Sequence, residues 1–369
     1  MISRRQILLM GAGLPLLSAC GGGGGGEGAP PKELAHEDVG VTTIAADDWA
    51  TAAPESQGIP AAAMQAMLDD GAGLPTLRAL LVVRNGKLVG ERYYADCKSS
   101  DLRHIRSATK TVCSLLVGQA LRDGKISGID ATLRELLPAQ LARVPLSAAG
   151  DITLRQVLQM RAGLDWSDDR GFNYDDINVT DFALALPVVR GAPWSYNSGA
   201  SHLLSPILSN AYGSDLLTIA QRNLFEPLGI KQVLWARDAS GAEHGSYGLR
   251  MRPRDLMKLA AMNLDGGQWQ GRSIVPAQWL AQSQLSHFKF NPLGLELDAM
   301  GYGYLWWTGA LGGHDVAMYY GWGGQLAIVV PALRMAVTTT ALWRVGDTTQ
   351  ITRGITAVVA RLLAKVTPA

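Results

Sequence analysis

Four apolar segments, two near each end of the chain, have the composition and spacing of paired β-strands. They are residues 77–83, 87–94, 325–330 and 335–340. Asn85-Gly86 separates the first two, and Asn-Gly is the strongest short signal for a β-hairpin. A turn at Pro331 separates the other two. We therefore expect two hairpins that join in one antiparallel sheet, built from both ends of the chain.

Helical periodicity dominates the remaining sequence. Apolar residues recur at intervals of three and four over residues 60–70, 154–160, 201–209, 216–225, 253–263 and 350–365. The first and last of these segments adjoin the predicted hairpins, so we expect helices to flank the sheet. The pattern predicts an α/β domain formed by residues 46–115 and 286–369, with a helical domain, residues 116–285, inserted between its two parts.

The first twenty residues have the organisation of an export signal. A basic start is followed by an apolar run, residues 7–17, which is too short to span a bilayer. Ser3-Arg4-Arg5 and the residues that follow it also resemble a twin-arginine signal. We therefore expect the protein to leave the cytoplasm.

The export signal ends in Leu17-Ser18-Ala19-Cys20, which resembles a bacterial lipobox. By this resemblance residues 1–19 form a lipoprotein signal peptide and Cys20 carries the lipid; an ordinary cleaved signal is the alternative. Residues 20–45 contain six consecutive glycines and predict a flexible tether. The sequence thus predicts a domain held by lipid at a bacterial membrane, on its periplasmic side.

Composition and motif content exclude several classes of function. The chain has 33 Lys and Arg against 32 Asp and Glu, and a net charge of +1 gives no reason to expect a nucleic-acid partner. The six histidines lack metal-site spacing, and the sequence contains no nucleotide-binding glycine loop and no Gly-x-Ser-x-Gly motif. We therefore expect no metal, no cofactor and no α/β-hydrolase.

Two cysteines remain once the signal is removed. In an oxidising compartment Cys97 and Cys113 could form a disulfide. Cys113, however, lies in an apolar helical segment, where a small buried thiol is common. The residues alone leave both states open.

The motif Ser-x-x-Lys, which can supply a nucleophile and its base, occurs twice. Ser107 and Lys110 directly precede residues 112–121, which are apolar on nearly every face and predict a central, buried helix. The two side chains would lie on one face of its first turn, where the helix N-terminus favours developing negative charge. Ser286 and Lys289 precede no helix and indicate a loop. For the first motif, a capping serine and a solvated lysine are the alternative.

Further motifs favour a catalytic role for Ser107. They are residues 106–111, 152–166, 193–199, 249–256, 301–307 and 321–325. In order and spacing they resemble the serine β-lactamase and penicillin-binding-protein-like superfamily, in particular its class C-like branch of esterases and amidases. The last two resemble the 6-aminohexanoate-dimer hydrolase group. The resemblance covers nearly the whole chain after the tether and implies a β-lactamase-like α/β fold.

The resemblance implies a role for each matching residue. Ser107 matches the nucleophile, Lys110 the lysine that activates it, and Tyr196 a tyrosine that carries protons between the serine and the leaving group. The backbone N–H groups of Ser107 and Trp322 would form the oxyanion hole. Ser198 stands where the family has an asparagine.

The third family element, Lys-Thr-Gly in β-lactamases, aligns with Tyr319-Tyr320-Gly321. Tyr319 then replaces the lysine that helps to bind the lactam carboxylate, which disfavours β-lactam substrates while acyl transfer is retained. Together with Ser198 and Trp322, these three residues are expected to contact substrate.

The other aromatic and acidic residues are expected to have structural roles. Among the tryptophans we expect only Trp322 at the site, because burial in the core is the usual role of the others. Asp165, Asp175 and Asp176 are expected to be turn or cap residues.

The sequence therefore predicts a membrane-anchored serine hydrolase that cleaves an ester or amide bond of a small molecule through an acyl-enzyme on Ser107. One alternative is a true β-lactamase or D-Ala-D-Ala carboxypeptidase on the same fold. The other is a catalytically silent protein that binds the cell wall.

Overall fold

The computed structural model describes residues 49–168, 174–289, 297–344 and 346–368. The predicted signal peptide, the predicted lipidation site Cys20 and the predicted tether lie outside these ranges. Within them, no helix combines the length and the apolar character that are needed to cross a membrane.

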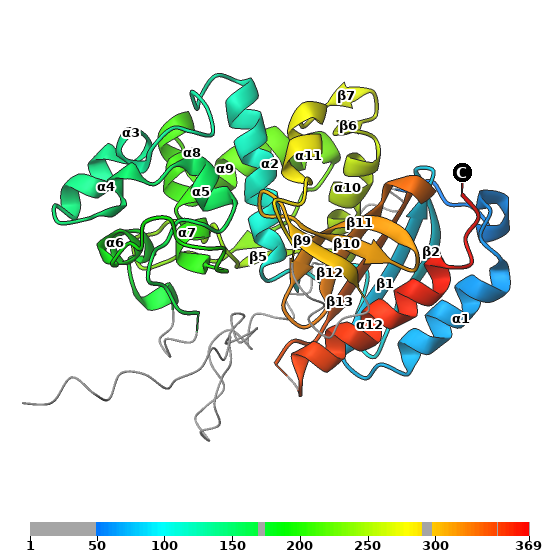
Figure 1. The fold of residues 1–369 in the computed structure, drawn as a ribbon. Helices are drawn as coiled ribbons and strands as arrows, with labels where there is room; N and C mark the ends of the chain where they lie inside the picture. Colours follow the sequence, from blue (N-terminus) through cyan, green and yellow to red (C-terminus); the bar gives the residue numbers. More distant parts are fainter. Residues whose placement is uncertain (1–48, 169–173, 290–296, 345, 369) are drawn as a thin grey trace, which may run out of the picture.

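Strands from both ends of the chain form one antiparallel sheet, as predicted. In the described residues it has eight strands in the order β2-β1-β13-β12-β11-β10-β9-β8 (Figure 1). The bounds are β1 (Leu77–Arg84), β2 (Lys87–Tyr93), β8 (Phe288–Lys289), β9 (Asp298–Tyr302), β10 (Trp307–Leu311), β11 (His314–Gly321), β12 (Gln325–Val330) and β13 (Met335–Ala341). The N-terminal strand β1 pairs with the C-terminal strand β13, which joins the two chain ends.

Both predicted hairpins are confirmed, and local turn chemistry explains them. Between β1 and β2, Asn85 and Gly86 have φ values of 51° and 75°. Such a turn needs positive φ at both central residues, which Asn and Gly adopt most readily. Between β12 and β13, Pro331 opens a short 3-10 turn, Pro331–Leu333.

Helices cover both faces of the sheet. α1 (Ala61–Ala72) and α12 (Thr348–Leu363) pack against each other, and Figure 1 shows them in front of the sheet. α10 (Pro253–Leu264) packs across β1, β12 and β13, and α2 (Ala108–Arg122) contacts β11. Every residue of β12 and β13 is buried. Since successive side chains of a strand point to opposite faces, both faces of the sheet centre are covered.

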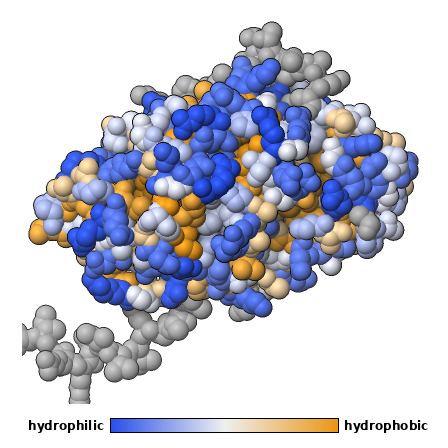
Figure 2. All heavy atoms as spheres, turned by 90° about the horizontal axis from the view of Figure 1, so that it is seen from above, coloured by the Kyte–Doolittle hydropathy of each residue, from blue (hydrophilic) through white to orange (hydrophobic). Residues whose placement is uncertain are grey.

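A helical lobe lies beside the sheet, as Figure 1 shows. Its helices are α3 (Leu133–Leu136), α4 (Pro138–Arg143), α5 (Leu154–Leu158), α6 (Val179–Ala185), α7 (Ser198–His202), α8 (Leu204–Tyr212) and α9 (Leu216–Ala220). A further α-helix, α11, spans Ala277–Ser283. One small sheet contains β3 (Arg103–His104), β5 (Leu249–Met251) and β4 (Leu234–Trp235), and another contains β6 (Gln268–Trp269) and β7 (Arg272–Ser273). On the face seen in Figure 2, hydrophilic side chains predominate and hydrophobic ones form separate patches.

One helix of the segment predicted to form the helical domain packs on the sheet. α10 falls within residues 116–285, which were assigned to the helical domain, but its apolar face is buried against the strands of the sheet. α10 therefore belongs with the sheet. Periodicity predicts the helix itself, but it does not tell which element the apolar face packs against.

Both remaining cysteines are buried and free. The sequence left open whether Cys97 and Cys113 form a disulfide or remain free thiols, and in the structure they are free thiols. Burial raises the pKa of Cys97 to about 11 and that of Cys113 to about 12, so neither thiol is prone to ionise near neutral pH.

Candidate active site

The predicted nucleophile lies at the start of the buried helix α2. All residues of α2 except Leu121 and Arg122 are buried, as its sequence predicts. Ser107 immediately precedes the helix and is partly exposed. The residue before it, Arg106, has a φ of 51°, and its carbonyl oxygen accepts a hydrogen bond of 2.7 Å from the Thr109 hydroxyl. The serine is therefore held at the accessible end of a helix that is otherwise fixed in the core.

Lys110 lies one helical turn after the serine and is 2% exposed. Its Nζ lies 3.2 Å from Ser107 Oγ, 3.1 Å from Ser198 Oγ and 2.9 Å from the carbonyl oxygen of Ser246. The same Nζ lies 4.7 Å from the centre of the Tyr196 ring. The structure thus brings together the four side chains that the sequence singles out, and it excludes the alternative of a solvated lysine.

The segment that carries Tyr196 is held on both sides. Met160, just after α5, has a φ of 56°, and its carbonyl oxygen accepts a hydrogen bond of 2.9 Å from the Ser195 N–H. The Asn197 side chain donates to the Leu164 carbonyl oxygen at 3.0 Å and also caps α7. The sequence motif that contains Met160 and Leu164 therefore supports the position of the tyrosine.

The third contact of Lys110 comes from a segment that sequence reasoning missed. Its acceptor is the backbone carbonyl of Ser246, and a carbonyl group carries no residue-type signal. The one trace in the sequence is Gly245. A Cβ at this position would lie 2.8 Å from the carbonyl oxygens of Ser201 and His202. Only glycine therefore allows this segment to lie so close to α7.

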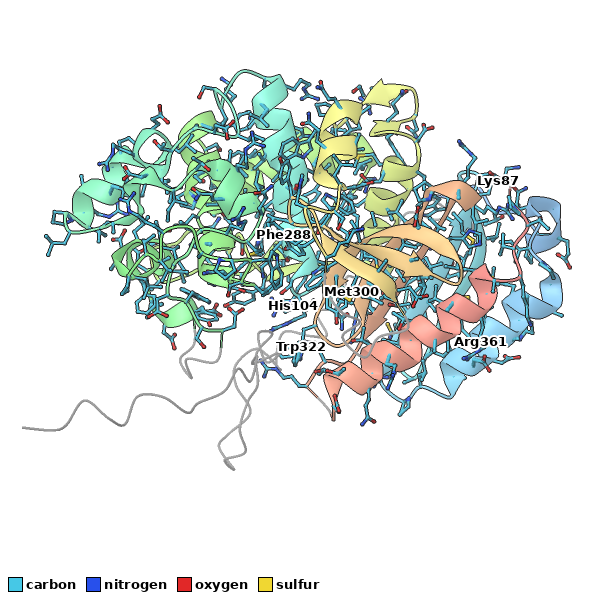
Figure 3. All side chains as sticks on the ribbon, in the orientation of Figure 1. Lys87, His104, Phe288, Met300, Trp322 and Arg361 are labelled. Carbon is cyan, nitrogen blue, oxygen red and sulfur yellow. The ribbon has the colours of Figure 1, made fainter. Side chains whose placement is uncertain are left out.

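Strand β11 passes beside the nucleophile at Gly321, as the family alignment implies. A Cβ at Gly321 would clash with the carbonyl oxygen of Ile105, two residues before Ser107. Trp322 follows at the turn between β11 and β12 and is partly exposed. Figure 3 shows its side chain near the same end of the sheet as His104 of β3. The strand predicted to supply an oxyanion donor is thus adjacent to the predicted nucleophile.

Tyr319 does not take the place that the sequence analysis assigns to it. It is fully buried, and its hydroxyl accepts a hydrogen bond of 2.6 Å from the Asn263 side chain and donates to the Leu259 carbonyl at 3.4 Å, both in α10. Burial raises the pKa of Tyr319 far above its usual value. The prediction that Tyr319 contacts substrate is therefore wrong. Because side chains alternate along a strand, Tyr320 points the other way, and its ring centre lies 5.4 Å from that of Trp307.

Aromatic side chains surround Tyr196. Its ring stacks on that of Trp307 at 6.0 Å and lies 6.4 Å from that of Trp194. The sequence analysis expected only Trp322 among the tryptophans here, so Trp307 is an addition made by the structure. Trp306 is fully buried, as expected of a core residue.

The second Ser-x-x-Lys motif lies in a loop, as predicted. Ser286 precedes β8, and its hydroxyl donates to the Phe288 carbonyl oxygen at 2.9 Å. No helix begins at this serine. In the part of the chain that the structure describes, no group of three or more His, Cys, Asp or Glu side chains is arranged as metal ligands.

A curated hydrolase resembles part of this chain. The 6-aminohexanoate-dimer hydrolase of Paenarthrobacter ureafaciens is 22% identical over 227 residues, which are 55% of each chain. The chain therefore matches only about half the length of this curated relative.

Two solved structures share the fold. The D-amino acid amidase from Ochrobactrum anthropi SV3 has a TM-score of 0.66 and 17% identity, over 82% of this chain and 97% of its own. EstCE1, a hydrolase with promiscuous acyltransferase activity, has a TM-score of 0.64 and 16% identity, over 81% of this chain and all of its own. At these identities the likeness shows the fold, and it confirms the predicted β-lactamase-like architecture.

The sequence model of the Beta-lactamase family matches residues 46–353, which include every element of the site described above. This match confirms the resemblance on which the predicted hydrolase class rests. The chain belongs to the beta-lactamase family.

Proposed function

We propose that this family member is a serine hydrolase that cleaves ester or amide bonds of small molecules through an acyl-enzyme on Ser107. The observation that carries the proposal is the geometry of Lys110. Its Nζ lies within hydrogen-bond distance of the Ser107 hydroxyl and of two other oxygens, those of Ser198 and Ser246. The amidase and the acyltransferase-active hydrolase among the structural relatives support acyl transfer as the chemistry.

The contacts of Lys110 suit a general base. A neutral amine has two N–H donors and one lone pair. The Ser246 carbonyl and Ser198 hydroxyl oxygens can accept the two donors, which leaves the lone pair for the Ser107 proton. Lys110 would thus take the proton as Ser107 Oγ attacks the carbonyl carbon.

The remaining groups complete the reaction. The N–H groups of Ser107 and Trp322, with the N-terminal end of α2, would stabilise the oxyanion. Tyr196, whose ring lies next to Lys110 Nζ, would relay the proton to the leaving group as the bond to it breaks. Water then attacks the acyl-serine, a proton returns to the serine, and the free acid leaves.

Labelling with a fluorophosphonate tests this proposal. The wild type should gain the phosphonyl mass on the peptide that contains Ser107 and should hydrolyse short-chain p-nitrophenyl esters. Ser107→Ala should lose both properties, and Ser286→Ala, which changes the loop serine of the second motif, should keep both. A label on any other residue, or turnover by Ser107→Ala, would contradict the assignment.

We also propose that the chain is exported and anchored through a lipid on Cys20. The lipobox-like Leu17-Ser18-Ala19-Cys20 and the glycine-rich residues 20–45 support this proposal. In a bacterial host, Cys20→Ala should release the protein from the membrane fraction and abolish labelling by a palmitate analogue. A wild type that incorporates no label would contradict the anchor.

A further inference from the structure

The segment that holds Lys110 is itself held by an acidic residue of a distant loop. Ser246, whose carbonyl oxygen accepts from Lys110 Nζ at 2.9 Å, lies between His244 and Tyr247. His244 Nε2 donates to Asp175 Oδ1 at 2.7 Å, and the Tyr247 hydroxyl donates to the same oxygen at 2.8 Å. One carboxylate oxygen thus fixes the side chains on both sides of the carbonyl that contacts the lysine.

These contacts form a compact unit. The rings of His244 and Tyr247 stack at 4.4 Å between centres. The His244 side chain is completely buried, whereas that of Asp175 is 30% exposed. Hydrogen bonds to a carboxylate are about twice as strong as neutral ones, so the Asp175 contacts restrain the side chains of this segment strongly.

The inner side of the segment is also fixed. Gly245 lies against α7, the helix that begins with Ser198, the other oxygen partner of Lys110. His202, at the end of α7, has its ring centre 5.5 Å from that of His244. Burial lowers the pKa of His202 to about 3, so the His202 ring is neutral. The segment is therefore supported by α7 on its inner side. On its outer side Asp175 holds it by hydrogen bonds, and the rings of His104 and Tyr174 lie beside that of Tyr247.

We propose that Asp175 is a positioning residue for Lys110. Through His244 and Tyr247 it fixes the Ser246 carbonyl, and this carbonyl in turn orients the lysine toward Ser107. The proposal rests on the function proposed above. Asp175 lies in the short 3-10 turn Tyr174–Asp176, as the sequence analysis expects of a turn residue. Its carboxylate in addition accepts two hydrogen bonds from a segment about seventy residues away, which the sequence analysis did not expect.

Asp175→Asn tests the proposal, with Asp176→Asn as its matched control. Asp176 is the next residue in the chain and is exposed. A misplacement of about 1 Å in a catalytic group costs up to about 100-fold in rate. We expect Asp175→Asn to lower kcat for a p-nitrophenyl ester by about 10- to 100-fold while KM changes by less than about twofold. The rate of Ser107 phosphonylation should fall by the same factor, and Asp176→Asn should match the wild type in all three.

Two further variants keep the test decisive. Tyr247→Phe removes one of the two donors and should lower kcat in the same direction, which covers the case in which Asp175→Asn does not fold. The double variant Asp175→Ala/Tyr247→Phe should be no slower than Asp175→Ala, because Asp175→Ala already removes the hydrogen bond that the Tyr247 hydroxyl donates to Asp175.

The outcomes separate the two proposals. If Asp175→Asn equals Asp176→Asn, or if its loss appears only in KM, Asp175 does not position the lysine and the inference fails. If the wild type is not phosphonylated at Ser107, the proposed function fails instead.

Discussion

The close approach of strand β11 to the nucleophile predicts that Gly321→Ala removes most activity without unfolding the protein. The added Cβ would clash with the carbonyl oxygen of Ile105. The Cβ is fixed to the backbone of β11 and the oxygen is itself a backbone atom, so no side-chain rotation relieves the clash. To reach ordinary contact, which begins at 3.4 Å, β11 and the segment before Ser107 must separate by roughly 1 Å.

The size of the effect follows from what this separation moves. Trp322, whose N–H we assign to the oxyanion hole, is the next residue of the chain, and Ser107 is two residues after Ile105. Donor and nucleophile would therefore separate by about the same distance, and a misplacement of this size costs about 100-fold in kcat. Overpacking costs about 1–3 kcal/mol of stability, which a folded domain of this size tolerates.

A steady-state ester assay and a thermal melt check this prediction. Gly128→Ala is the control, because an added Cβ there meets nothing within 4 Å. We expect the control to keep wild-type kcat and Gly321→Ala to lose about two orders of magnitude. A folded Gly321→Ala enzyme with kcat within twofold of the wild type would refute the reasoning.

Three further predictions follow from the arrangement of the site and the core. Because residues 319–321 include no lysine, β11 brings no cation to the site there. The wild type should therefore hydrolyse short-chain p-nitrophenyl esters clearly and cephalosporins weakly or not at all; a cephalosporin kcat/KM equal to that for esters would contradict this. Tyr319→Lys should lower the melting temperature and leave cephalosporin hydrolysis unchanged, since position 319 faces α10 and not the site; a gain in that activity would overturn this placement. Asp255→Asn removes the buried carboxylate that pairs with Arg252 at 2.6 Å and lies 3.8 Å from Lys258. It should therefore lower the free energy of unfolding, measured in urea, by about 3–5 kcal/mol. A loss below about 1 kcal/mol would show that the buried ion pair contributes little to stability.

Local chemistry explains which parts of the structure the sequence predicts well. Asn85-Gly86 specifies its turn through two residues that tolerate positive φ, so the hairpin needs no distant information. The helix after Ser107 is apolar on nearly every side, and this separates Ser107 from Ser286, which no such helix follows.

The parts that the sequence did not predict depend on distant contacts. The Ser246 carbonyl reaches Lys110 because Gly245 lies against α7, and Asp175 meets His244 and Tyr247 across about seventy residues of chain. Nothing in the local pattern around these residues encodes such pairings. Tyr319 lies in β11, but its side chain points to α10 and not to the site; a single step along a strand decides the face, and the local sequence does not specify that step.

The most direct measurement of the central claim is detection of the acyl-enzyme during turnover. The wild type would be mixed with a slowly hydrolysed p-nitrophenyl ester, quenched in acid within the first turnovers, digested and analysed by mass spectrometry. The account predicts one acylated peptide, with the acyl group on Ser107, which disappears at the rate of steady-state turnover. Turnover without an acylated peptide, or an acyl group on another residue, would contradict it.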